Sequence, residues 1–526
     1  MSSPSYDHAV VRGLFFNLLG TLGKAFTPVF FILVGRLYGA AALGVYLLVF
    51  TFIEMLRKLA VGGLNDGIMI YTARNLVRPE DEDIAYRVIG NSIFLALLLC
   101  GVIVVALELG MSVLLPMYEA EGVQRLVRIM AAGLPLHALP VLLVSATKAH
   151  VEMKWDALMG GFIRPFGLFF FALVCYWLDM GMDGLAWGYL ATGLAMSVSG
   201  VLIFLRHFSL RRLLATAGLF KPMRDLVGFV IPQSLNLTFI DMIAGFDIMM
   251  LGFFGVQPAL IGYYGIAAQL VYNIEQVRKA FSGAYAPVIA RLYREKHIDE
   301  MNTSFNKVSR WTMLVAFPVG MIVVFFHREL LQLFHPAFGI PLAVSMTEII
   351  PTSLIGLLDL GYLEQMGETG FMILLLMVPL LSCGVGLAGN LIVMTGKSAW
   401  SLLNSGIVAG LSFLFATLLI PEYGLYGAAL SAALAAVVIR AIQLLESELL
   451  LSVRLHWSLV YKPWLAAAIG TVVMLPAMRL DVCFGIRLMV IAGILFLYFF
   501  SLRQLGFEDG DTNLLMPWRK KQRGGQ

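Results

Sequence analysis

Residues 88–110, VIGNSIFLALLLCGVIVVALELG, contain a single charged side chain, Glu108, in a run that is otherwise almost entirely apolar. A helix that crosses the hydrocarbon core of a bilayer needs about 20 mainly apolar residues. Comparable runs recur along the 526 residues, which are 60% hydrophobic and 13% charged, with a mean hydropathy of +0.85. A soluble domain is typically about a quarter charged. The sequence therefore predicts an all-α polytopic membrane protein.

The apolar runs of spanning length predict about 14 transmembrane helices. The segment 336–370 interrupts the pattern with prolines and acidic residues, so it is predicted to be an extramembrane insertion or an interfacial helix. The helices are expected near residues 13–38, 43–74, 88–110, 124–147, 157–178, 184–206, 226–254, 259–291, 308–331, 371–395, 400–420, 424–446, 463–479 and 486–505.

Lys and Arg residues are unevenly distributed between the predicted loops. If the N-terminus lies inside, most of them fall on the inside, including the basic C-terminal tail, whereas the outside loops hold only Arg36, Arg125, Arg128, Arg328, Arg479 and Arg487. Cytoplasmic loops of membrane proteins carry an excess of Lys and Arg. The asymmetry therefore predicts that both termini are cytoplasmic.

The sequence lacks features that are typical of several functional classes. No predicted loop is long enough to fold alone, which disfavours membrane glycosyltransferases, and no GxxxxGK[ST] phosphate-binding loop is present. The four cysteines, Cys100, Cys175, Cys383 and Cys483, are widely spaced and favour small core residues over a metal site. The net charge of +4 gives no indication of nucleic-acid binding. We expect no enzymatic activity and no cofactor. We expect instead a transporter that is driven by an ion gradient or by the gradient of its substrate.

Short motifs recur in the two halves of the chain. Glu54-Met-Leu-Arg57-Lys58 resembles Glu275-Gln-Val-Arg278-Lys279, and Gly44-Val-Tyr46 resembles Gly262-Tyr-Tyr264. Gly184-Leu185 also resembles Gly424-Leu425 at the start of a later helix. Internal repeats are common in transporters, which bind their substrate between the repeats. We predict two parallel six-helix lobes, residues 1–224 and 225–447, followed by a C-terminal helix pair and basic cytoplasmic tail in residues 448–526.

These motifs also resemble a known family, the oligosaccharide flippase (polysaccharide transport) branch of the multidrug/oligosaccharidyl-lipid/polysaccharide exporter superfamily. The likeness covers most of positions 12–446, and the segment 336–370 departs from the family pattern. It is carried by Gly35-Arg36-Leu-Tyr-Gly39 through Gly44-Val-Tyr46, Pro232 through Asp247, Ile261-Gly-Tyr-Tyr264, Ala284-Tyr-Ala-Pro287 and Pro421-Glu-Tyr-Gly-Leu-Tyr-Gly427-Ala-Ala429.

The resemblance implies that the two lobes surround a cavity that opens alternately to each side of the membrane. It implies that the cargo is a lipid-diphosphate-linked oligosaccharide, moved from the inner to the outer leaflet of a bacterial cytoplasmic membrane for the biosynthesis of cell-surface polysaccharide. The expected partners are membrane lipid, the lipid-linked glycan and, as a further expectation, a glycan polymerase or glycosyltransferases.

Ionisable side chains in the middle of a membrane cost several kcal/mol on insertion, about 2.5–3.5 each, so they are candidate functional residues. In each Glu-x-x-Arg-Lys motif, the glutamate faces the two cations at i+3 and i+4, which leaves one positive charge in surplus. Phosphate oxygens are bound by such cations through charge-assisted hydrogen bonds. An interlobe salt-bridge network without a substrate role is the alternative interpretation. The candidates are Lys24, Arg57, Lys58, Arg278 and Lys279 as substrate ligands, with Glu54 and Glu275 bracing them.

Two carboxylates on the predicted helix 226–254, Asp241 and Asp247, are candidate coupling sites for Na⁺ or a proton. Helix packing through hydrogen bonds is the alternative role for Asp241. His137 lies between two prolines and is expected to bind a backbone polar group that they free. Arg164 and Arg440 are expected to extend toward lipid phosphates at the inner surface.

Two other functions remain open at this point. A drug or small-molecule antiporter of the same superfamily is expected to have an apolar cavity with one or two acids, and not paired cations. A membrane scaffold for glycan-assembly enzymes has little reason to carry charges in mid-membrane.

Overall fold

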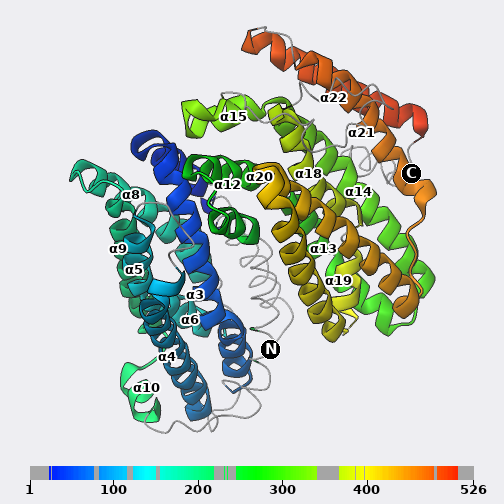
Figure 1. The fold of residues 1–526 in the computed structure, drawn as a ribbon. Coiled ribbons are helices and arrows are strands. Elements are labelled where there is room, and N and C mark those ends of the chain that lie inside the picture. The colour runs from blue at the N-terminus through cyan, green and yellow to red at the C-terminus, as the bar shows by residue number, and fades with distance from the viewer. Residues whose placement is uncertain are drawn as a thin grey trace, which may run out of the picture. The chain divides into compact units, whose positions relative to one another are not determined.

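The structure is a computed structural model that describes residues 20, 23–24, 26–75, 82–114, 122–149, 154–217, 230, 234, 245–339, 367–385, 387–395, 397–478 and 483–506. Within these ranges the chain is helical and contains no strand (Figure 1). Among the described residues, nine helices are long and apolar enough to cross a membrane, or up to ten if the bent pair α18 (Gly367–Val385) and α19 (Leu387–Met394) is one span. The predicted multi-pass α-helical fold is confirmed, whereas the count of about 14 spans stays a prediction.

The helices form two compact units. The first comprises Met1–Gly265 and Leu333–Phe338, and the second comprises Ile266–Gln332 and Gly339–Gln526. The boundary at Gly265 falls inside α12 (Pro258–Tyr272), so residues 225–265 are grouped with the first unit. The predicted lobe boundaries after residues 224 and 447 stay predictions, and each unit is described by itself below.

The first unit is built around α3 (Ala40–Asn75) and α6 (Leu134–Lys148), which pack against each other. α9 (Asp183–Phe204) packs on α6 and on α8 (Arg164–Trp177), and Figure 1 shows α8 and α9 side by side. The other helices of the unit are α2 (Phe26–Leu33), α4 (Glu82–Leu114), α5 (Val123–Ala132), α7 (Lys154–Leu158) and α10 (Leu210–Ala217).

Close backbone packing of α3 on α12 holds two glycines together in the first unit. A Cβ atom on Gly44 would lie 1.6 Å from the carbonyl oxygen of Pro258, and one on Gly262 would lie 3.0 Å from the main-chain nitrogen of Gly44. Real Cβ atoms essentially never approach below 3.0 Å. The two equivalent Gly-x-Tyr motifs therefore meet where only glycine fits.

Several predicted helices are interrupted by local irregularities. The π-helix Val34–Tyr38 ends the first one, and the π-helix Met159–Ile163 separates α7 from α8. The predicted continuous helix 259–291 was wrong, because α12 ends at Tyr272 and α13 (Glu275–Arg294) begins after a short turn. Single π-helical turns and broken membrane helices often lie at functional sites.

The second unit contains α13, α14 (Ile298–Phe325), α15 (His327–Phe334, whose last two residues belong to the first unit), α18, α19 and α20 (Ser398–Leu451). α20 consists of two helices that meet at Gly424, where φ is 53°. This left-handed conformation favours glycine. The break agrees with the prediction of separate helices at 400–420 and 424–446.

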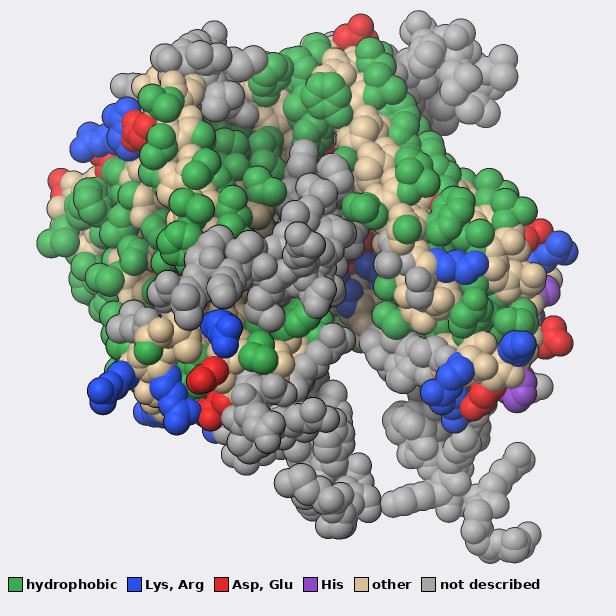
Figure 2. Space-filling view, turned by 90° about the horizontal axis from the view of Figure 1, so that it is seen from below, with side chains coloured by type: hydrophobic (Ala, Val, Ile, Leu, Met, Phe, Trp, Pro, Cys, Tyr) green, Lys and Arg blue, Asp and Glu red, His purple; other side chains and the backbone are tan. Residues whose placement is uncertain are grey.

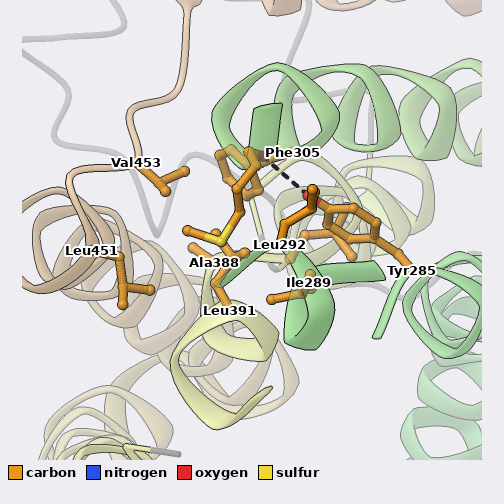
Figure 3. Close-up of a cluster of buried hydrophobic side chains, with 10 residues drawn as sticks. Tyr285, Ile289, Leu292, Phe305, Ala388, Leu391, Leu451 and Val453 are labelled. Carbon is orange, nitrogen blue, oxygen red and sulfur yellow. Dashed lines mark hydrogen bonds between the residues drawn. The ribbon is translucent and has the colours of Figure 1, made fainter. Parts of the chain in front are cut away.

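A cluster of buried hydrophobic side chains packs together in the second unit (Figure 3). It joins the α13–α14 turn to α19 and the end of α20, and Tyr285 donates a hydrogen bond to the main-chain oxygen of Met301 at 3.2 Å. The cluster consists of Tyr285, Ile289, Leu292, Met301, Phe305, Leu387, Ala388, Leu391, Leu451 and Val453.

The predicted C-terminal helix pair is present as α21 (Trp457–Ala477) and α22 (Phe484–Leu505), which pack against each other and on α14. Arg487 at the start of α22 forms an ion pair with Glu329 and donates to the main-chain oxygen of Phe325 at 3.2 Å. These contacts attach α22 to the end of α14.

Large apolar side chains cover much of the described surface, and Lys and Arg gather in groups (Figure 2). Leu109 is 77% exposed and Leu449 is 80% exposed. Exposure on this scale fits a surface in contact with lipid rather than water. Three cysteines, Cys100, Cys175 and Cys383, are buried as predicted for core residues, and Cys483 is exposed.

Candidate functional site

A buried ion pair lies on α3 within the first unit. Arg57 donates from Nε and Nη2 to Oε2 of Glu54, at 3.1 and 3.0 Å, and both residues are 8% exposed. Their separation by three positions puts them on one face of the helix. The predicted pairing of Glu54 with Arg57 is therefore confirmed.

The second cation on Glu54 comes from another helix. Nη2 of Arg164, the first residue of α8, lies 2.6 Å from Oε1 of Glu54. The prediction that Arg164 extends toward lipid phosphates was wrong, because a buried carboxylate within reach offers a stronger partner than the membrane surface. The contact is an ion pair without hydrogen-bond geometry, and among the described residues Nη2 of Arg164 has no hydrogen-bond acceptor.

Two aromatic rings on α6 and α9 complete this cluster. Tyr189 donates its hydroxyl to Oε1 of Glu54 at 3.0 Å, and His137 stacks on the Tyr189 ring with a centroid distance of 4.0 Å. Nε2 of His137 donates to the main-chain oxygen of Tyr189 at 2.9 Å. His137 binds a backbone group as expected, but the group belongs to α9 and is not one freed by the two prolines; the main-chain oxygen of Leu136, four residues before Pro140, accepts a hydrogen bond from Ser197 instead. Four helices thus converge on Glu54, and we call Glu54, Arg57, Arg164, Tyr189 and His137 the Glu54 cluster.

The second motif forms a looser arrangement in the second unit. Arg278 lies 3.7 Å from Glu275, measured from Nη2 to Oε2, and its side chain is 17% exposed. Glu275 is the first residue of α13, where the positive end of the helix dipole favours an anion. Within the described part of the chain, Nε of Arg278 has no hydrogen-bond acceptor.

Arg440 belongs to this second site. It donates from Nη1 to Gln443 at 2.7 Å and from Nη2 to Ser382 on α18 at 2.9 Å. Ser382 is followed by Cys383, whose Sγ lies 3.9 Å from the main-chain oxygen of Ile274, directly before Glu275, so these contacts bring Arg440 near the second motif. The prediction that Arg440 extends toward lipid was therefore wrong. We call Glu275, Arg278 and Arg440 the Glu275 cluster.

The other predicted site residues lie apart from these contacts or outside the described residues. Lys24 and Lys279 are exposed, and Lys58 is half-buried. Asp247 is buried and accepts a hydrogen bond from the hydroxyl of Tyr264 at 2.9 Å. Asp241 lies outside the described residues. The two motifs fall in different units, so the expectation that Arg57 and Arg278 both bind the substrate stays a prediction.

Sequence reasoning missed Arg164, Tyr189 and Arg440 as members of the clusters. For Arg164 a signal was present, because Gly161 lies three residues before it and allows close packing in the π-helix. A Cβ atom on Gly161 would lie 2.5 Å from the main-chain oxygen of Gly20. A tight helix contact next to an arginine indicates that this residue lies within the protein, and not at its rim.

Both clusters combine one carboxylate with two guanidinium groups, so each carries a net positive charge. Some of their N–H donors have no acceptor among the described residues, namely Nη2 of Arg164, Nε of Arg278 and Nε of Arg440. Buried donors are nearly always satisfied in native proteins, and an unmet one calls for an explanation such as a ligand. The arrangement is suited to binding an anion.

Comparison with known families and structures supports this fold. Residues 33–336, more than half of the chain, match the family described as polysaccharide biosynthesis protein. No match was found among curated proteins.

Among solved structures, an inward closed conformation of the lipid II flippase MurJ matches with a TM-score of 0.68 and 12% identity, over 97% of this chain and 100% of that one. An inward-facing multidrug resistance MATE transporter of the MOP superfamily matches with a TM-score of 0.59 and 16% identity, over 84% and 98%. A MOP superfamily transporter from Pyrococcus furiosus matches with a TM-score of 0.54 and 17% identity, over 84% and 95%. These likenesses show the fold.

The sequence match shows the family, and the similar structures show that the chain shares the fold of the predicted superfamily. The similar structures are those of flippases and transporters, in keeping with the prediction that the chain is not an enzyme. The chain is a multi-pass membrane protein that belongs to the polysaccharide biosynthesis protein family and has the fold of the MOP superfamily of transporters.

Proposed function

We propose that this protein is a flippase that moves a lipid-diphosphate-linked oligosaccharide from the inner to the outer leaflet of a bacterial cytoplasmic membrane by alternating access. Its product would enter the assembly of cell-surface polysaccharide, with a glycan polymerase or glycosyltransferases as partners. The observation that carries the proposal is the pair of arginine-rich clusters, each with two guanidinium groups for one carboxylate.

The charge of the clusters fits a diphosphate better than it fits a cationic drug. A guanidinium that is partly withdrawn from water is costly unless it is paired, so the surplus cations of Arg164, Arg278 and Arg440 favour an anionic ligand. Arginine binds phosphate oxygens with geometric specificity through its planar fork of donors. A cation antiporter needs the opposite balance, with carboxylates in excess.

The family match and the fold give independent support for the cargo class. Members of the matched family are described as polysaccharide biosynthesis proteins, and the similar MurJ structure is that of a lipid II flippase. A flippase of glycan precursors joins both descriptions in one activity.

The proposal includes an orientation and an energy source. Both termini would lie in the cytoplasm. A reporter that is active only outside the membrane, fused after Gln526, should therefore give no signal.

An ion gradient would supply the energy. Binding of Na⁺ or a proton to Asp241 or Asp247 would couple that gradient to transport. A transport rate of Asp241→Asn that stays dependent on the ion gradient would assign Asp241 to helix packing instead.

Deletion of the gene in its native cell tests the function. We expect loss of the surface polysaccharide and accumulation of its lipid-diphosphate-linked precursor in the inner leaflet, because synthesis continues while translocation stops. A plasmid copy of the gene should restore both. Normal surface polysaccharide without precursor accumulation in the deletion strain would contradict the proposal.

A further inference from the structure

We propose that Glu54 is an exchangeable anion, which holds Arg57 and Arg164 while the substrate is absent and is displaced from them by the anionic group of the substrate. The inference rests on the proposed function and deepens it, because it assigns Arg164 as a second ligand in the first unit and gives Glu54 a role in substrate release.

The contacts of the Glu54 carboxylate are ones that a phosphate group of the substrate could take over. Its Oε2 accepts two hydrogen bonds from Arg57, while its Oε1 contacts Arg164 and accepts a hydrogen bond from Tyr189. The carboxylate thus occupies the space between two guanidinium groups from α3 and α8. A phosphate group presents the same charge-assisted acceptors with more oxygens.

Arg164 is the member of the cluster that an incoming anion reaches first. Its side chain is 25% exposed, whereas those of Glu54 and Arg57 are 11% and 10% exposed. Its Nη2 is itself buried and contacts Glu54 without hydrogen-bond geometry, so the Glu54 carboxylate leaves this donor unsatisfied. Arg164 also follows the π-helix Met159–Ile163, a type of irregularity that is frequent at functional sites.

Tyr189 can keep its hydrogen bond to Glu54 after the carboxylate has left the two arginines. Its hydroxyl bonds to Glu54 and does not depend on either arginine. The Tyr189 ring is held by its stack on His137, whose Nε2 bonds to the main-chain oxygen of the same tyrosine. Glu54 would keep this hydrogen bond during exchange, and its return to the arginines would release the substrate.

The test is the binding of farnesyl diphosphate, a short polyprenyl diphosphate, to the purified full chain in detergent. The variants are Glu54→Gln, which removes the competing charge, and Arg164→Gln, which removes the second ligand. The matched controls are Glu108→Gln and Arg128→Gln, which alter an exposed ion pair of 2.9 Å in the same unit. Size-exclusion profiles and Tm establish that each variant is folded.

We expect Glu54→Gln to bind farnesyl diphosphate about tenfold more tightly and Arg164→Gln about tenfold more weakly than the wild type, a coupling of ordinary size. The two controls should match the wild type. Farnesol should not bind measurably better to Glu54→Gln, because it carries no anion for the arginines.

Unchanged or weaker binding by Glu54→Gln, or unchanged binding by Arg164→Gln, overturns the inference and leaves the proposed function standing. If no protein, including the wild type, binds farnesyl diphosphate, the proposed function falls together with the inference. If Glu54→Gln does not fold, Glu54→Asp replaces it, since the shorter carboxylate cannot span both arginines. Glu54→Asp should also bind farnesyl diphosphate more tightly than the wild type, and unchanged or weaker binding by this variant would overturn the inference.

Discussion

Substitution of Gly44 by valine should destabilise the protein strongly and abolish transport. A Cβ atom at this position would lie 1.6 Å from the carbonyl oxygen of Pro258 and 2.9 Å from the main-chain nitrogen of Gly262. Backbone atoms cannot move aside as a flexible side chain does, so α3 would be forced away from α12. Overpacking of a core costs about 1–3 kcal/mol, and a backbone collision belongs at the upper end of that range or above it.

The matched control for Gly44 is Gly101 on α4, where a Cβ atom would meet nothing within 4 Å. Alanine at this position should be neutral or slightly stabilising, because alanine favours a helix over glycine by up to about 1 kcal/mol. Gly44→Ala should instead lower Tm in detergent and the yield of folded protein. Equal Tm values for Gly44→Ala and Gly101→Ala would show that the close contact between α3 and α12 does not exist in the protein.

Replacement of Arg57 by alanine should reduce transport by about a hundredfold, since truncation of one partner in a buried charged contact costs a few kcal/mol. Arg57 is buried and makes two hydrogen bonds to Glu54. Arg57→Lys should restore only part of the activity, because lysine lacks the planar fork. Restoration of surface polysaccharide in the deletion strain, normalised to protein level, measures the effect.

The double variant Arg57→Ala with Glu54→Ala distinguishes substrate binding from a salt-bridge network. A network without a substrate role predicts rescue, because the stranded carboxylate is removed along with its partner. Our account predicts no rescue of transport even where the protein level recovers. The exposed Arg128, paired with Glu108, supplies a control whose alanine variant should transport normally. Full activity of the double variant would assign Glu54 and Arg57 to structure alone.

The sequence was sufficient for those features that depend on local spacing or on composition. The apolar run 88–110 predicted a spanning helix, and the structure places it within α4. The spacing of Glu54 and Arg57 predicted their pairing, since residues three apart share a helix face. The glycine at position 424 marked the break between two helices that the structure places inside α20.

Contacts between distant helices could not be predicted in this way. Glu54 takes its second cation from Arg164 on α8, and not from the neighbouring Lys58 as expected from helix spacing. The choice depends on how α3 and α8 pack, which no local pattern records. The turn between α12 and α13 was also missed, because Asn273 and Ile274 include neither glycine nor proline.

The repeated Gly-x-Tyr motifs were predictable from the sequence in one respect, their recurrence, and unpredictable in another, their contact. Their recurrence was visible in the sequence and predicted related halves of the chain. Their role was visible only in the structure, where Gly44 and Gly262 pack against each other in the first unit. Tyr264 of the second motif also binds the buried carboxylate of Asp247. A repeat thus indicates equivalent positions, whereas the contact between them depends on three-dimensional packing.

Reconstitution of the purified protein into liposomes that contain a fluorescent polyprenyl-diphosphate oligosaccharide tests the central claim most directly. A membrane-impermeant quencher measures the fraction of label in the outer leaflet over time. We predict that the wild type moves the labelled lipid between leaflets much faster than Arg57→Ala does and faster than protein-free liposomes allow. A wild-type rate equal to that of protein-free liposomes would contradict the account.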